Sequence, residues 1–324
     1  MSEPTTDSRI PFWLAIATLL TALLPILMGA LTTTRDAGMA FPDWPSSDGH
    51  NMITYPWLRS AGDKFLEHGH RLGGVLIGLV SIALVWGVWT KEPRRWVRLM
   101  SVAVLLSVIL QGLLGGQRVL LNERGLAFVH GSLAVLVFGL MGALAAVTSR
   151  GWKEVSELET PFALRGLERL GIVTLVAIFV QYTLGGLLRH QGQMALEHAG
   201  FAAIVFLLTA FTAGAAAFSN LRWLRAPSFG LAGLITLQLV LGLGAWATKF
   251  GLPGVVDVPR LHSLPQVVFR TAHVLGGMFV FLSTLILVLR VMRLRWRQQQ
   301  GTVRVSDSAS NRSQTLPLTA KGVV

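Results

Sequence analysis

The sequence predicts an all-α integral membrane protein whose eight transmembrane helices form two pseudo-symmetric four-helix bundles. Of its 324 residues, 52% are hydrophobic and only 14% are charged, whereas a soluble domain carries roughly a quarter charged residues. Runs of about 20 apolar residues, enough for a helix to cross a bilayer core, recur along the chain. A histidine-containing helical hairpin also recurs four times, twice in each half.

The apolar runs define the predicted spans and the division of the chain. The predicted spans are residues 11–30, 70–90, 97–120, 126–147, 167–188, 195–218, 229–248 and 267–291. They group into an N-terminal bundle (11–148) and a C-terminal bundle (167–294), joined by a cytoplasmic linker (149–166). Residues 1–10 are expected to form a cytoplasmic N-terminus. Residues 295–324, rich in Ser, Thr and Gln, are expected to form a disordered cytoplasmic tail.

The net charge of +12 is spread over short basic clusters between the apolar runs. With the N-terminus in the cytoplasm, most Lys and Arg residues fall on the inner side, so both termini are predicted to be cytoplasmic. The predicted location is the inner (cytoplasmic) membrane. A nucleic-acid-binding face would need a continuous basic surface, so the predicted surroundings are the lipid bilayer and no nucleic acid. The N-terminal segment lacks the basic start of a secretory signal, and the first run is therefore expected to stay as a span.

Two long outer loops, 31–66 and 249–266, contain proline and aromatic residues. The first includes FPDWP at 41–45 and the second GLPG at 251–254. Such residues favour an ordered loop that packs on the bundle. These loops either rest on the end of the bundle or cover an outward-facing site.

A QxxLG pattern recurs in the odd-numbered spans. It begins at Gln111, Gln181 and Gln238, and a degenerate copy runs from Pro25 to Gly29. The first and last positions of the pattern share one helical face. The glycine allows close approach of another backbone or of a flat ligand, and the pattern is equally compatible with plain helix packing.

Each copy is followed by an outer loop and a histidine at the start of the next span: His70, His130, His198 and His273. Ionisable groups inside membrane spans are costly and are seldom incidental. Because there is no cysteine, any metal must be held by His, Met or carboxylate side chains. Four histidines at similar depth on alternate helices can pair across the bundles, and two imidazoles can ligate one heme iron from opposite sides. The sequence therefore predicts two heme sites near the outer face.

Several basic residues near the outer bundle end are candidate partners of heme propionates, or interfacial cations that snorkel to the membrane surface. They are Arg71, Arg118, Arg189, Lys249 and Arg270. Arg71, next to His70, is the strongest candidate. His68 is an alternative ligand to His70, whereas His50, His190 and His262 are expected to be peripheral.

One carboxylate breaks the symmetry between the repeats. Glu67 lies three residues before His70, so the two share a helical face. The other repeats have Ala127, Ala195 and Arg270 at this offset. The sequence predicts either that the His70 site performs chemistry or that Glu67 forms a salt bridge with Arg71 or Arg270.

The motif Glu67-x-x-His70-Arg71, together with His130, His198 and His273 on alternate spans, resembles the heme A synthase family of cytochrome oxidase assembly proteins. The likeness covers about residues 12–295 and includes the first outer loop, with DAGMAFPDWP at 36–45. The resemblance implies oxidation of the C8 methyl of heme O to a formyl group, giving heme A. Some members carry a cysteine pair in the first outer loop; this chain has none, so a mechanism that needs those thiols does not apply.

The resemblance also implies roles for the two halves. His70 and His130, with Arg71, would bind heme O as the substrate, and Glu67 would be the catalytic carboxylate. His198 and His273 would ligate a resident heme b, with Arg270 beside it. Heme O synthase and an electron donor are the implied partners. Two rival hypotheses remain: a non-enzymatic di-heme b-type electron carrier, and a transporter or proton-relay protein without heme.

Overall fold

The computed structural model describes residues 8–155, 164–219, 221–256 and 258–314, with side chains described as far as residue 300. In these segments the chain is helical and contains no strand. The eight predicted spans are confirmed as helices long and apolar enough to cross a membrane. They are α1 (Ile10–Thr34), α2 (Gly62–Lys91), α3 (Arg95–Leu121), α4 (Arg124–Thr148), α6 (Leu164–Gln191), α7 (Ala195–Phe218), α8 (Arg222–Phe250) and α9 (Leu264–Gln314).

Two short helices lie between the spans. They are η1 (Trp57–Arg59) in the first long loop and α5 (Arg150–Glu154) in the predicted linker. Helix α9 runs past the predicted end of its span and includes the first part of the segment expected to be a tail. The remainder of that segment, 315–324, lies outside the described residues.

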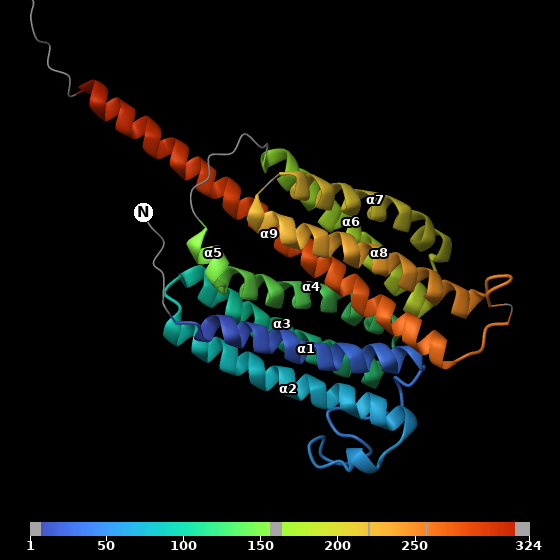
Figure 1. The fold of residues 1–324 in the computed structure, drawn as a ribbon. Helices are drawn as coiled ribbons and strands as arrows, with labels where there is room; N and C mark the ends of the chain where they lie inside the picture. The colour runs from blue at the N-terminus through green and yellow to red at the C-terminus, as the bar shows by residue number, and fades with distance from the viewer. Residues whose placement is uncertain (1–7, 156–163, 220, 257, 315–324) are drawn as a thin grey trace, which may run out of the picture.

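Each half forms a closed ring of four helices (Figure 1). In the N-terminal half, α1 and α3 each pack on both α2 and α4, and in the C-terminal half α6 and α8 pack in the same way on α7 and α9. The halves meet through α4 on α9, flanked by α4 on α6 and α1 on α9. The two long loops lie at one end of the molecule, and α9 projects from the other (Figure 1). This arrangement confirms the two pseudo-symmetric four-helix bundles.

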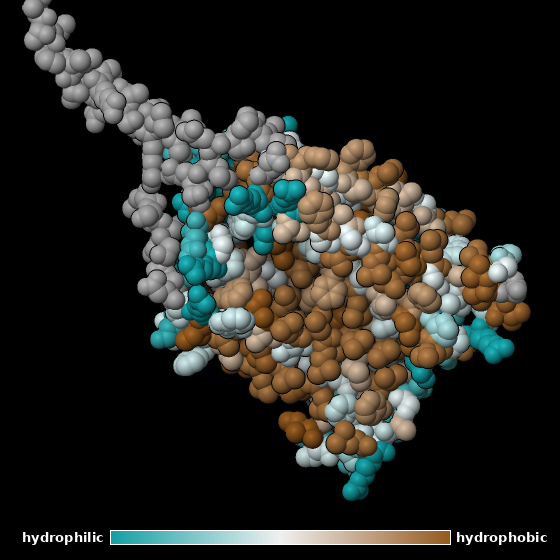
Figure 2. All heavy atoms as spheres, in the orientation of Figure 1, coloured by the Kyte–Doolittle hydropathy of each residue, from teal (hydrophilic) through white to brown (hydrophobic). Residues whose placement is uncertain are grey.

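The face of the bundle seen in Figure 2 presents a broad apolar area, with hydrophilic residues towards the two ends. Large apolar side chains are exposed on several of the spans, including Leu20, Ile82, Leu106, Val176 and Leu243. Exposure of this kind is unfavourable in water but matches the hydrocarbon of a bilayer. The chain is therefore a multi-pass membrane protein.

The contact between the halves depends on small residues of α4. A side chain at Gly142 would overlap with Leu282 of α9, and a Cβ at Gly139 would lie 2.8 Å from Phe281. Phe138 packs edge-on against Phe279 with ring centroids 5.7 Å apart. Helices in lipid associate by close packing rather than by the hydrophobic effect, so these glycines set the distance between the two bundles.

A buried ion pair fixes the short turn between α2 and α3. Arg94 donates from Nε to Glu92 Oε1 at 2.7 Å and from Nη2 to Oε2 at 2.9 Å. Its Nη2 also donates to the carbonyl of Val147 on α4, at 3.1 Å. Burial acts to raise the pKa of Glu92, but the hydrogen bonds and charge of Arg94 outweigh it, and the pKa lies below its ordinary value. The ion pair therefore connects the end of α2, the start of α3 and the end of α4.

Replacing Glu92 by alanine is expected to destabilise the fold, because it leaves the buried Arg94 without a counter-charge. Breaking a buried pair in this way costs about 3–5 kcal/mol. The measurement is thermal unfolding of the detergent-solubilised protein. Glu154→Ala, which removes half of the exposed Arg150–Glu154 pair, is the control and should leave Tm almost unchanged. Equal Tm values for the two variants would contradict the prediction.

Candidate functional site

The structure brings the four predicted histidines together in two pairs. His70 on α2 faces His130 on α4, and His198 on α7 faces His273 on α9. In both pairs the ring centroids lie 6.1 Å apart, and the ring planes are inclined at 89° and 85°. Each pair crosses the centre of its own four-helix ring, close to the end that carries the long loops.

This separation matches what one metal atom between two imidazoles requires. With metal–nitrogen bonds of about 2 Å on opposite sides, the ring centroids fall about 6 Å apart. Within the described residues, no group of three or more His, Cys, Asp or Glu side chains can hold a metal ion. A tetrahedral site needs four such ligands, so two-ligand pairs fit a metal whose remaining ligands come from a macrocycle, as in heme.

The outward hydrogen bonds of two rings define their tautomers. His70 Nδ1 lies 2.7 Å from the carbonyl oxygen of Pro25, and His198 Nδ1 lies 3.2 Å from that of Gln181. A carbonyl oxygen only accepts, so Nδ1 carries the proton in both rings and Nε2 is left as the unprotonated nitrogen. Metal-ligating histidines generally donate their second ring N–H in this way.

Glu67 is buried beside the His70 site and is fully engaged by the protein. Its Oε1 accepts from Nη2 of Arg71 at 2.6 Å, and its Oε2 accepts from the backbone N–H groups of Ala40 and Phe41 at 2.7 and 3.4 Å. Of the two predicted salt-bridge partners, the structure places Arg71 against this carboxylate. The pair is closed to solvent, with Arg71 only 9% exposed.

Arg71 also anchors the first long loop. Its Nη1 donates to the carbonyls of Asp43 and Ser46 at 2.8 and 2.7 Å, and its guanidinium lies over the Phe41 ring. Because these contacts occupy the guanidinium, the structure offers it little freedom for an additional anionic partner. His68, on a different face of α2 from His70, bonds the Ser47 hydroxyl through Nδ1 at 3.0 Å.

The loop therefore covers one end of the N-terminal ring, beside the His70–His130 pair. Trp44 lies against Gly116 of α3, directly after the Gly115 that contacts His130. Within the loop, Asp43 accepts from the N–H groups of Asp48 and Gly49 at 3.0 and 2.9 Å. Burial acts to raise the pKa of Asp43, but these hydrogen bonds outweigh it and lower the pKa to about 2. The loop is thus internally braced as well as tied to α2.

The other basic residues predicted as partners of heme propionates differ in how far the protein already engages their side chains. Arg189 donates through Nη2 to Ala30 and Thr34 of α1 at 2.6 and 3.0 Å, so it ties α6 to the N-terminal half. Arg118 lies against Gly38 of the first loop. Arg270 and Lys249 are half-buried at the end of the C-terminal ring that carries the second long loop.

The histidines expected to be peripheral also have defined places. His262 bonds Asp36 at 3.2 Å and so joins the two long loops, and His50 is exposed. His190 falls beyond the predicted span of residues 167–188, but it lies within the last turn of α6, with Nε2 3.4 Å from the position of a Cβ on Gly131. Glu197, which directly precedes His198, is exposed on α7.

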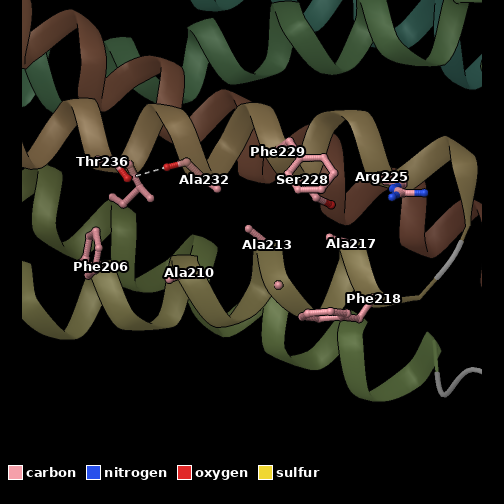
Figure 3. A pocket seen from close by; sticks show the side chains of 12 residues that line it. Phe206, Ala210, Ala213, Ala217, Phe218, Arg225, Ser228, Phe229, Ala232 and Thr236 are labelled. Carbon is pink, nitrogen blue, oxygen red and sulfur yellow. Dashed lines mark hydrogen bonds between the residues drawn. The ribbon is translucent and has the colours of Figure 1, made fainter.

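A separate groove of about 500 Å³ lies between α7 and α8 (Figure 3). Small and aromatic side chains line it, and Arg225 stands at one end. It contains none of the histidines and lies nearer the opposite membrane face. We therefore locate the functional site at the histidine pairs.

The fold and the site define a class: a multi-pass membrane protein with two facing histidine pairs in two repeated four-helix rings. Residues 11–198 match the family described as cytochrome oxidase assembly protein. The chain belongs to this family. The matched segment contains Glu67, His70, His130 and His198, and His273 lies beyond it.

Curated relatives are similar over part of their length. A heme A synthase of Chelativorans sp. (strain BNC1) is 28% identical over 151 residues, which are 44% of this chain and 41% of the relative. The heme A synthase of Shewanella oneidensis is 29% identical over 187 residues, 54% of this chain and 55% of the relative. That of Rhizobium etli is 33% identical over 141 residues, 39% of this chain and 36% of the relative. The matches thus span about half, or less, of these relatives.

Proposed function

We propose that this protein is a heme A synthase, which oxidises the C8 methyl of heme O to a formyl group for cytochrome c oxidase assembly. The observation that carries the proposal is the pair of facing histidine sites, one of them with a buried carboxylate three residues before a ligand. Family membership and the heme A synthase relatives support it.

The two rings are assigned different roles. His70 and His130 in residues 11–148 bind the substrate heme O, and His198 and His273 in residues 167–294 hold a resident heme b. The bound heme b would supply electron transfer. Arg270 lies one turn before His273 and is positioned to bind a propionate of that heme. Arg118 is better placed than Arg71 to meet a propionate in the first ring, because Arg71 is occupied by Glu67 and the loop carbonyls.

The proposed location is the inner (cytoplasmic) membrane, with both termini in the cytoplasm and the heme sites near the outer face. The inner clusters of Lys and Arg support this orientation. Heme O synthase would supply the substrate within the same membrane, and a separate electron donor would serve the heme b site.

The test is expression of the full chain in cells that contain heme O but make no heme A, followed by acid extraction and chromatography of the pigments. Heme A is expected in cells that express the chain and not in cells with an empty vector. Bound heme without heme A would overturn the enzymatic assignment.

A di-heme b-type electron carrier is the second candidate. The observation that favours it is the engagement of Glu67, whose two oxygens are satisfied by Arg71 and loop amides as in a structural anchor. This candidate predicts two hemes b in the purified protein and unchanged heme O in the same cells. A chain purified without any heme would contradict both candidates and favour a transporter.

A further inference from the structure

The repeated QxxLG segments lie opposite the histidines. The copies on α1, α3, α6 and α8 each meet the histidine at the start of the following span, in both halves of the molecule. The glycine that ends each copy lies against the Cε1 atom of that imidazole. The contacting pairs are Gly29 with His70, Gly115 with His130, Gly185 with His198 and Gly242 with His273.

Three of these glycines have no room for a side chain. A Cβ built on Gly29, Gly185 or Gly242 would lie 2.9 Å from Cε1 of its histidine, closer than carbon atoms pack. At Gly115 the corresponding distance is 3.5 Å, an ordinary contact. Alanine at the first three positions would therefore push the imidazole away, whereas at Gly115 it would fit.

The spacing of the pattern has a physical reason. Residues i and i+4 lie one above the other on a helix. In two of the four copies the imidazole places its Nδ1–Cε1 edge on this turn, so that Nδ1 bonds the carbonyl of residue i and Cε1 passes over residue i+4. Pro25 with Gly29 and Gln181 with Gly185 show both contacts. At Gly29 and Gly185, only glycine lets the ring come close enough to the carbonyl.

The glutamine side chains of the repeat contact the backbone carbonyls of the same histidines. Gln181 donates through Nε2 to the backbone carbonyl of His198 at 2.8 Å, and Gln238 donates to that of His273 at 2.9 Å. With its amide oriented so that both the nitrogen and the oxygen have partners, Gln111 donates to the backbone carbonyl of His130 at 3.2 Å and to Nδ1 of the same residue at 2.8 Å. Pro25 has no amide side chain, so His70 lacks this second contact from its repeat.

We infer that the QxxLG repeat positions the heme-ligating histidines: the glycine admits the ring, the glutamine amide fixes the backbone that bears it, and for His70 and His198 the carbonyl at the first position also fixes the tautomer. The inference rests on the proposed heme binding by the two pairs and assigns Gly29, Gly185, Gly242, Gln181 and Gln238 as positioning residues. His70 is set apart because it is held by ring contacts without a glutamine.

The test compares two glycines of the same helix in the full-length protein, purified from heme-supplied cells. Gly242→Ala should lower the amount of low-spin heme bound by the C-terminal histidine pair about 10-fold or more. Residues that orient metal ligands usually change metal affinity by a factor of this size. Gly230→Ala, whose Cβ meets nothing within 4 Å, should match the wild type. The readouts are heme per protein and the electron paramagnetic resonance spectrum of the oxidised heme. In the N-terminal ring, Gly29→Ala should lose more heme than Gly115→Ala.

A second variant covers the case in which Gly242→Ala does not fold. Gln238→Leu keeps the side-chain volume but removes the amide, and should retain heme with a shifted spectrum and midpoint potential. Heme content and spectra equal to wild type in Gln238→Leu, and in Gly242→Ala where that variant folds, would overturn the inference while leaving heme binding intact. A wild-type protein that binds no heme would instead overturn the proposed function.

Discussion

Replacing His273 by alanine should remove the heme held by the C-terminal pair and leave the N-terminal pair intact. Each pair supplies two imidazoles, and among the described residues no third His, Cys, Asp or Glu side chain lies close enough to complete a metal site with them. A heme held between His198 and His273 would keep only one of its two protein ligands and would be bound more weakly. His198→Ala should have the same effect, because the rings of His198 and His273 face one another at 6.1 Å.

The measurement is the reduced-minus-oxidised spectrum and the heme content of protein purified without added heme O. His262→Ala is the matched control: this histidine belongs to the second long loop, where it bonds Asp36 of the first, and its replacement should leave the spectrum unchanged. A smaller side chain in His273→Gly, supplemented with free imidazole, should restore part of the low-spin signal. Full heme content in His273→Ala would show that the C-terminal heme is held elsewhere.

The spans and the histidine pairs could be predicted because both depend on local regularities of the chain. Hydropathy identifies a span from about 20 consecutive residues. The hairpin repeat places a histidine at equal depth on alternate spans, so the pairing within each ring follows from symmetry. His70 with His130 and His198 with His273 are these pairs.

The contacts that the sequence did not specify join residues far apart in the chain. Glu67 bonds the amide of Ala40, and Arg189 of α6 reaches the carbonyl of Ala30 on α1. Nothing in local composition tells which backbone group a buried charge will meet. His68 illustrates the same limit. It lies only two residues before His70, but it projects from a different face of α2 and bonds Ser47 of the first long loop.

The role of the QxxLG repeat was also ambiguous in the sequence. Glycines and amides at this spacing are typical both of helix packing and of ligand sites. The structure distinguishes between them because the glycines contact imidazole atoms rather than the backbone of a neighbouring helix. Gly139 and Gly142 of α4, by contrast, serve packing between the two halves.

Glu67→Gln should keep both hemes bound and abolish the formation of heme A. If the carboxylate takes part in the oxidation of the substrate methyl, loss of its charge should lower the heme A yield about 100-fold or more, the range found for positioned acid–base groups. Glutamine retains an acceptor oxygen for the N–H of Ala40, so the first loop should stay in place. Alanine is expected to block heme A formation with hemes retained as well, but it also leaves the buried Arg71 without its partner.

Two readouts separate catalysis from anchoring of the loop. The heme A to heme O ratio in extracted pigments reports catalysis. The rate of tryptic cleavage at Arg59, exposed in the first long loop, reports loop attachment. A catalytic Glu67 predicts that Glu67→Gln loses heme A with unchanged heme content and unchanged cleavage. Wild-type heme A yield in Glu67→Gln would remove the catalytic role, and faster cleavage with loss of heme from the His70 pair would identify Glu67 as an anchor of the loop that covers this site.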